Sequence, residues 1–216
     1  MRQTLHASEI SQGLYSIFRS AGIYDAFQRL IGANRARTFF IKQFVVPFPG
    51  AKVLDIGCGT GAMLECLPES VEYVGFDLNP NYISYAQRRY GRRGSFFCDR
   101  VSTASAIQGG PFDFVLGFGI LHHLTDQESR TLFELAYDSL KPSGTIVTYD
   151  SVFVEYQSRI ARYIISKDRG RHVRTPAKYI ALAKTAFTDI DGHVSHDLLR
   201  MPYSHFIMKC YRVPRR

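Results

Sequence analysis

Short apolar runs alternate with longer amphipathic segments through the middle of the chain. The apolar runs have the length and flanking turn residues of buried strands, whereas the segments between them carry apolar residues at helical spacing. Strand and helix alternating at this spacing predict an α/β domain built on a doubly wound, mostly parallel sheet. The predicted strands are residues 52–56, 71–76, 95–98, 112–116 and 144–149, and the predicted helices are 62–67, 80–90 and 127–140.

Both flanks depart from this alternation. The first ~45 residues carry an amphipathic helical pattern after a candidate N-cap at Ser8, and they predict a helical lead-in. Beyond residue 150, an amphipathic helix is marked by Phe153, Tyr156, Ile160, Tyr163 and Ile164. A basic connector over 167–174 and a helix over 177–186, opened by Thr175 and Pro176, follow. The last two strands, 188–195 and 203–211, are joined by so short a link that we expect an antiparallel hairpin.

Composition fits one domain. The chain has 216 residues, 45% of them hydrophobic, which is enough for one buried core. We expect residues 1–46 to form a helical cap on the substrate side, 52–150 the cofactor-binding core, and 151–216 the substrate-side helices and terminal hairpin. No apolar stretch approaches the ~20 residues that span a bilayer, and no apolar signal core opens the chain, so we expect a cytoplasmic protein.

Net charge and cysteine spacing narrow the range of possible functions only slightly. The formal charge of +8 favours an anionic partner, whether nucleic acid, membrane surface or small acidic substrate, although a solvated surface accounts for most basic residues. The four cysteines form no C-x-x-C pair, so we expect them to be reduced and buried, and we predict no metal site.

The loop after the first predicted strand is rich in glycine: Asp55-Ile56-Gly57-Cys58-Gly59-Thr60-Gly61. Alternating glycines let the backbone turn sharply and approach a ligand closely. The stretch also satisfies the looser dinucleotide fingerprint, with Asp77 at the spacing of a ribose-binding acid. However, a carboxylate at Asp55 would repel a pyrophosphate and would suit a cofactor that carries an ammonium and a sulfonium, such as S-adenosylmethionine.

Acidic residues recur at the ends of the predicted strands. Asp55, Asp77, Asp99 and Asp150 follow strands one, two, three and five. One such acid is often only a turn residue. In a doubly wound sheet, however, ligands bind at the carboxyl ends of the strands, so four acids in register predict a binding site at that edge.

With these motifs in place, the chain resembles the class I S-adenosylmethionine-dependent methyltransferases, particularly the small-molecule branch. The resemblance extends over about 53–149 and is carried together by segments 53–61, 73–80, 97–99, 112–116, 121–124 and 140–145. It implies a Rossmann-like methyltransferase fold with a seven-stranded sheet. By matched position, the glycine loop would face the methionine moiety, Asp77 would accept from the ribose hydroxyls, and Asp99 would bind the adenine amino group. The cofactor residues implied are Asp55, Gly57, Cys58, Gly59, Gly61, Asp77, Leu78, Asp99, Arg100, Gly117 and Phe118.

A pair of histidines supplies the candidate base. A hydroxyl acceptor must lose its proton as it attacks the methyl group, and histidine is the usual agent near neutral pH. His122 follows strand four and Asp150 follows strand five, which are adjacent positions around the pocket in this family. The resemblance implies a His122–Asp150 catalytic dyad. The alternative is that His122 and His123 only close the turn beneath the cofactor.

We expect the acceptor to be enclosed by the regions that match the family least, namely the N-terminal helices and the segment after strand five. Arginines there would suit a phosphate, carboxylate or sugar-nucleotide acceptor. The candidate acceptor-binding residues are Tyr15, Tyr24, Arg35, His123, Arg169, Arg171, Arg174, Tyr203 and His205.

The favoured function is therefore methylation of a small metabolite at a hydroxyl or carboxylate oxygen. The positive charge keeps an RNA methyltransferase open, although no RNA-binding module or N-P-P-Y motif is present. A cofactor-binding regulatory protein without catalysis is a third hypothesis. A nicotinamide-dependent dehydrogenase is a fourth, disfavoured by Asp55 and by the terminal hairpin.

Overall fold

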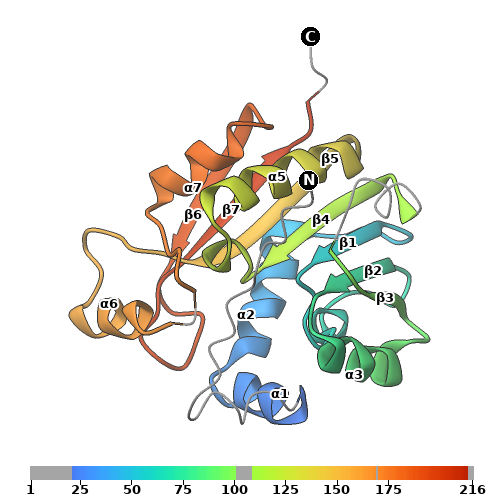
Figure 1. Cartoon of the computed structure of the whole chain (residues 1–216), viewed down its shortest axis with the longest axis horizontal. Coiled ribbons are helices and arrows are strands. Elements are labelled where there is room, and N and C mark those ends of the chain that lie inside the picture. The colour runs from blue at the N-terminus through green and yellow to red at the C-terminus, as the bar shows by residue number, and fades with distance from the viewer. Residues whose placement is uncertain (1–20, 101–108, 169, 214–216) are drawn as a thin grey trace, which may run out of the picture.

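The computed structural model describes residues 21–100, 109–168 and 170–213. Seven strands form one sheet in the order β3-β2-β1-β4-β5-β7-β6. All neighbours run parallel except β7, which is antiparallel to both β5 and β6. The order reverses between β1 and β4, which places a topological switch point there (Figure 1). The predicted fold class is confirmed.

The strands agree with the predicted segments, with shifts at their ends. Their bounds are Lys52–Ile56 (β1), Glu72–Asp77 (β2), Gly94–Cys98 (β3), Phe112–Phe118 (β4), Leu140–Ser151 (β5), Asp189–Ser195 (β6) and His205–Tyr211 (β7). β5 is longer than predicted because its pairing with β7 extends to Ser151 opposite His205. This extension carries Asp150 and Ser151 to the ligand edge of the sheet.

The helices are Ala21–Leu30 (α1), Ala33–Phe40 (α2), Pro80–Tyr90 (α3), Asp126–Ser139 (α5), Arg159–Ser166 (α6) and Pro176–Ala183 (α7). Local signals fix several of their starts. The Asn79 side chain accepts from the backbone of Asn81 and Tyr82 ahead of α3, and Thr125 with Glu128 forms a capping box at α5. The short helix predicted over 62–67 is a 3₁₀ turn at Ala62–Glu65.

The helix predicted from Phe153 onward begins later, at Arg159. The Ser158 side chain caps α6 by accepting from the Ala161 amide, whereas Val152 forms a bridge with Arg174. The chain therefore stays extended after β5, and α6 stands away from the sheet at the ligand edge (Figure 1).

Two apolar clusters hold helices on the two faces of the sheet, α5 and α7 on one and α2 and α3 on the other. Successive residues of one strand point to opposite clusters, as Val53 and Leu54 in β1 show. In Figure 1, α5 and α7 lie above the sheet and α1 to α3 below it.

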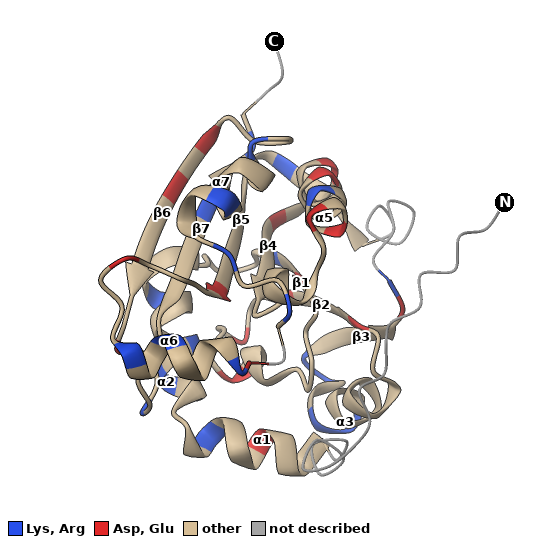
Figure 2. Cartoon of the chain, turned by 60° about the vertical axis from the view of Figure 1, so that its left-hand side comes forward, with Lys and Arg blue, Asp and Glu red and all other residues tan. Residues whose placement is uncertain are grey.

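Among the described residues, Lys and Arg are spread over several elements in the view of Figure 2, with acidic residues between them. Within the described part of the chain, no helix is long and apolar enough to cross a membrane. The four cysteines are free, but the prediction that all are buried is wrong, because Cys98 is exposed at the end of the edge strand β3.

Candidate active site

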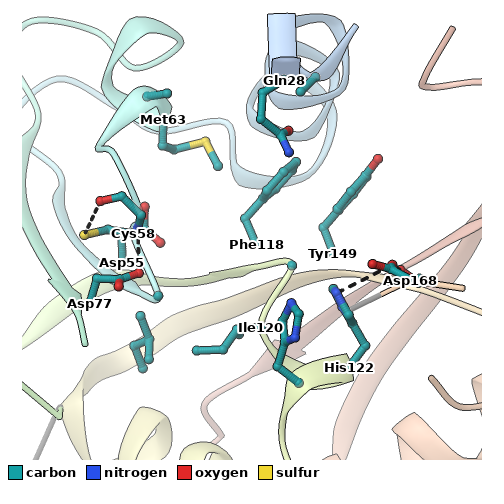
Figure 3. Close-up of a pocket in the computed structure, with 18 of the residues that line it drawn as sticks. Gln28, Asp55, Cys58, Met63, Asp77, Phe118, Ile120, His122, Tyr149 and Asp168 are labelled. Carbon is teal, nitrogen blue, oxygen red and sulfur yellow. Dashed lines mark hydrogen bonds and ion pairs between the residues drawn. The ribbon is translucent and has the colours of Figure 1, made fainter. Parts of the chain in front are cut away.

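A cavity of about 910 Å³ opens at the carboxyl ends of the central strands, where the topology predicts a ligand site. Its walls come from α1, α2, the glycine loop, the turn after β4, and the segments after β5 and before β7. Figure 3 shows Asp55 and Asp77 on one side of it and His122 with Asp168 on the other. Fourteen of the sequence-predicted site residues line it: Tyr24, Asp55, Gly57, Cys58, Gly59, Asp77, Leu78, Asp99, Arg100, Phe118, His122, His123, Tyr203 and His205.

Asp55 is buried near the carboxyl end of β1, where its Oδ2 accepts a 2.6 Å hydrogen bond from the Tyr73 hydroxyl. Burial raises the pKa of this carboxyl to about 7, against a smaller lowering by the Tyr73 hydrogen bond and by Arg37. Its Oδ1 is buried with no hydrogen-bond partner in the protein. An orphaned carboxylate oxygen at the lining of a cavity is complementary to a cationic ligand group.

Asp77 ends β2 and is held by the backbone. Its Oδ2 accepts from the Gly59 amide at 2.9 Å, and its Oδ1 accepts from the Asn79 amide at 2.8 Å. Burial raises the pKa of Asp77, and the backbone hydrogen bonds lower it by a smaller amount. Gly59 has φ +55°, and a Cβ built on it would meet no atom within 4 Å. The loop is therefore shaped for close approach of a ligand, with a carboxylate beside it to accept from hydroxyls.

Leu78, Asp99 and Arg100 form an exposed rim beyond β2 and β3. The Asp99 Oδ1 accepts from the Arg100 amide at 2.7 Å. Its carboxylate therefore lies at the rim of the cavity, near the position where the family resemblance expects adenine.

His122 lies in a 3₁₀ turn, Leu121–His123, directly after β4. Its Nδ1 is 2.8 Å from Asp150 Oδ1, and the same oxygen accepts from the His122 backbone amide at 3.1 Å. His122 and Asp150 are both buried, with 7% and 2% of their surfaces exposed. The carboxylate therefore orients both the ring and the backbone of His122, which is the arrangement of a positioned base.

A second carboxylate approaches His122 from the other side. Asp168, in the segment after α6, places its Oδ2 3.9 Å from His122 Nε2. That oxygen accepts from the Ser151 hydroxyl at 3.0 Å and from the Tyr203 hydroxyl. Sequence reasoning did not select Asp168 or Ser151. Ser151 directly follows Asp150, so a fifth strand predicted to its full length would have brought Ser151 to the same edge of the sheet.

Comparison with known proteins fits this geometry. A family model described as "Methyltransferase domain" matches residues 53–144, which contain the glycine loop, Asp77 and His122. Over this stretch the chain is similar to the S-adenosylmethionine-dependent methyltransferases.

Curated relatives of this chain are named for methyl transfer to different kinds of atom, oxygen in one and nitrogen in another. The chain is 30% identical over 124 residues to the ubiquinone biosynthesis O-methyltransferase of Idiomarina loihiensis. The aligned stretch covers 56% of this chain and 50% of that protein. The chain is also 30% identical over 186 residues to phosphoethanolamine N-methyltransferase 1 of Arabidopsis thaliana, covering 80% of this chain and 37% of that protein. The chain thus spans half or less of the length of these two relatives.

The fold also matches solved methyltransferase structures. Human N-acetylserotonin methyltransferase in complex with S-adenosylmethionine superimposes with a TM-score of 0.66 at 19% identity, covering 96% of this chain and 61% of that one. At this identity the match shows the shared fold.

Arg174 does not line the cavity, contrary to the sequence-based expectation. Its guanidinium is buried and donates to the carbonyls of Leu121, Leu124 and His172 at 2.7–2.9 Å and to Asp126 Oδ1 at 2.9 Å. Asp126 thereby has a lowered pKa, chiefly through its hydrogen bond to Arg174. Arg174 therefore fixes the turn that carries His122, and its guanidinium donates to groups of the protein and not to the cavity.

Other predicted residues also lie elsewhere. Arg35 is exposed and faces a separate surface hollow next to Lys42, and Arg171 is exposed outside the lining. Gly61 and Gly117 adjoin the lining without forming it, because side chains fill the space beside them. Tyr15 and Arg169 lie outside the described residues.

Arg37 is the basic residue that sequence reasoning missed. It lies two positions after Arg35 in α2, and helical geometry turns it from the solvent toward the cavity. Only 7% of its surface is exposed, its Nη1 donates to Asn34 at 2.8 Å, and its guanidinium lies 6.0 Å from the centre of the Phe118 ring. The available signal was the helical spacing of Ala33, Ala36, Arg37 and Phe40, which places Arg37 on the face of α2 that carries its buried residues.

An aromatic stack lines the side of the cavity between the two carboxylate ends. The Phe118 and Tyr149 ring centres are 4.2 Å apart, Tyr149 and His205 are 4.3 Å apart, and His205 and Tyr203 are 4.8 Å apart. Burial lowers the pKa of His205 to about 3, so this imidazole is neutral at physiological pH. The stack provides a flat, uncharged wall of the kind on which planar ligand groups pack.

Proposed function

We propose that the chain binds S-adenosylmethionine and transfers its methyl group to a hydroxyl oxygen of a small molecule. The observation that carries this proposal is one cavity with two chemically distinct ends. The glycine loop, Asp55 and Asp77 lie at one end, and His122, held from behind by the buried Asp150, lies at the other. The O-methyltransferase relative supports an oxygen acceptor, and the N-methyltransferase relative keeps nitrogen as the competing outcome.

The residues at the loop end fit the donor. Asp77 would accept from ribose hydroxyls, and the orphaned Oδ1 of Asp55 would face a cationic group. Arg37 would pair with a carboxylate, since a guanidinium binds carboxylates with two parallel hydrogen bonds. When bound, the donor supplies a methyl group already activated by a sulfonium leaving group, so alignment contributes much of the rate.

His122 would act as the base. If Nδ1 carries the proton and donates it to Asp150, the lone pair of Nε2 faces the cavity and can accept the proton of an acceptor hydroxyl. Asp150 would then stabilise the imidazolium that forms and keep the ring oriented.

The anionic acceptor predicted from the basic connector loses most of its support. Of the described residues in 167–174, Lys167 and Asp168 line the cavity, whereas Arg171 and Arg174 do not. The same placement weakens the RNA hypothesis, because Lys167 is the one basic residue among the described part of the connector that lines the cavity.

The test is methyl transfer from labelled S-adenosylmethionine to the fraction of a cell extract below 3 kDa. We expect label in small, extractable products with the wild-type protein and at least a hundredfold less with His122→Ala. S-adenosylhomocysteine affinity, measured by calorimetry, should be the same for both. Binding without transfer by the wild-type protein would instead identify a cofactor-binding protein without catalysis.

A further inference from the structure

Helix α1 encloses the loop end of the cavity, where the glycine loop lies. Residues three and four positions apart share one face of a helix. One such face of α1 lines the cavity with four residues: Tyr24, Phe27, Gln28 and Ile31. In Figure 3 the Gln28 side chain points from this helix into the cavity, toward Phe118. A ligand bound against the glycine loop would therefore have α1 as one of its walls.

A buried hydrogen bond joins α1 to the glycine loop itself. The Thr60 hydroxyl donates to Asp25 Oδ1 at 2.5 Å, and only 2% of the surface of Thr60 and 5% of that of Asp25 are exposed. The second oxygen of Asp25 is buried with no hydrogen-bond partner in the described part of the chain. A buried carboxyl group that is only half paired is unfavourable for stability. Stability alone therefore does not account for an aspartate at this position, and its contact with the loop is the feature to explain.

Two further contacts join α1 to the same side of the cavity. The rings of Tyr24 and Tyr82, the latter in α3, stack with their centres 5.2 Å apart. Arg29 pairs with Glu65 at 3.2 Å on the surface, where an ion pair contributes little. Of these three contacts, the Asp25–Thr60 hydrogen bond is the one that is buried and the one made to the loop. It therefore decides how closely α1 lies on the loop.

The other end of α1 is anchored to the link before β7. The Arg200 backbone amide donates to the Ile31 carbonyl at 2.9 Å. Gly32, which joins α1 to α2, has φ +88°, and a Cβ built on it would lie 3.2 Å from the Arg200 side chain. Residues at the ends of helices are the usual pivots when one element moves against another. With its C-terminal end anchored, α1 can leave the loop by pivoting near Gly32.

We infer that α1 is a cover for the bound methyl donor and that Asp25 is the positioning residue that holds this cover closed through Thr60. This inference rests on the proposed function. With the hydrogen bond made, the inner face of α1 encloses the donor beside the glycine loop. Without it, α1 spends more time away from the loop, so S-adenosylmethionine and S-adenosylhomocysteine dissociate faster.

Hydrogen exchange measured by mass spectrometry tests the cover directly. In the wild-type protein we expect S-adenosylhomocysteine to slow exchange of the amides of both α1 and the glycine loop. In Asp25→Ala saturated with the same ligand, the loop should stay protected and α1 should lose most of its protection. Binding to the wild type without added protection of α1 would overturn the inference and leave the proposed function intact. No binding of S-adenosylhomocysteine would overturn both.

The rate of ligand release tests Asp25. By surface plasmon resonance, Asp25→Ala should release S-adenosylhomocysteine about tenfold faster than the wild type, the effect of losing one buried hydrogen bond. Asp25→Asn keeps an acceptor oxygen for Thr60 and should release the ligand within twofold of the wild-type rate. The matched control is Arg29→Ala, which removes the surface pair from the same helix and should also stay within twofold.

A variant on the other side of the bond guards against misfolding of Asp25→Ala. Thr60→Val removes the hydroxyl and keeps the shape of the side chain, so it should speed release by a factor similar to that of Asp25→Ala. Thermal unfolding followed by circular dichroism identifies the variants that are folded. Release at the wild-type rate by a folded Asp25→Ala or Thr60→Val variant would refute the role of Asp25. Release by Arg29→Ala as fast as by Asp25→Ala would refute it as well.

Discussion

Gly170 lies directly against the His122 ring. A Cβ atom at position 170 would be 2.0 Å from His122 Cδ2, closer than any packing allows. The His172 amide also donates to the His122 carbonyl at 2.9 Å. The segment after α6 therefore forms one wall of the site of the candidate base.

Replacing Gly170 by Ala should displace the imidazole, because the new methyl group and the ring cannot share this space. We expect Gly170→Ala to reduce methyl transfer by at least tenfold, since a displacement of about 1 Å at a reacting group has large effects on rate. S-adenosylhomocysteine affinity should stay within twofold of wild type by calorimetry. The control is Gly22→Ala, because a Cβ at Gly22 meets nothing within 4 Å. Normal transfer by Gly170→Ala would mean that His122 is not positioned by this contact.

Arg174 should contribute to stability as well as to the geometry of the turn. Arg174→Ala leaves the buried carbonyls of Leu121, Leu124 and His172 without their donor, so we expect a loss of about 2–4 kcal/mol in the free energy of unfolding. Arg174→Lys keeps the charge but cannot reproduce the fork of donors, so its loss should be intermediate.

Urea unfolding measures the effect of these variants. Arg159→Ala, at an exposed position in α6, is the control and should change the free energy by less than ~0.5 kcal/mol. The loss in Arg174→Lys should be accompanied by lower methyl transfer, since the turn carries His122. A fully stable Arg174→Ala variant would show that water replaces the guanidinium.

Sequence reasoning found the elements whose signals are local. The glycine loop and the acids after strands one to three each depend on residues within a few positions, and the structure places Asp55, Asp77 and Asp99 at the lining of the cavity. The assignment of Arg174 was wrong because most of its partners are about 50 residues away, in and just after the turn that follows β4. A buried arginine and an exposed one look alike in a sequence. Asp168 escaped for the same reason, since only the folded chain places it beside His122.

Asp77 should be required for donor binding. Asp77→Ala removes the carboxylate that would accept from ribose and also frees the Gly59 amide, so the loop loses an anchor. We expect S-adenosylhomocysteine affinity to fall by about 1–3 kcal/mol, the usual effect of losing charged hydrogen bonds. Calorimetry measures this loss, and NAD should show no measurable binding to either protein. Unchanged affinity would show that the nucleoside lies away from β2.

Donor binding should depend on pH through Asp55. Because burial raises its pKa to about 7, Asp55 is mostly protonated at pH 6 and mostly ionised at pH 8. A cationic donor interacts favourably with the ionised form. Its affinity should therefore rise as pH increases through about 7 and change little from this group above pH 8. Asp77, whose pKa burial also raises, acts in the same direction, whereas Arg37 favours ionisation of Asp55.

The same pKa has the opposite consequence for the ligand-free fold. The pKa of Asp55 is higher in the folded protein than the ordinary 3.8, so its contribution to stability is fully present below 3.8 and is lost as pH rises through about 7. Asp55→Asn removes the titrating group and keeps its shape. We therefore expect this variant to show flatter curves, both for S-adenosylmethionine affinity by calorimetry and for the unfolding midpoint, between pH 6 and pH 8. If the variant and the wild type showed parallel curves, Asp55 would not titrate in this range, and the dependence would belong to Asp77 or to the donor itself.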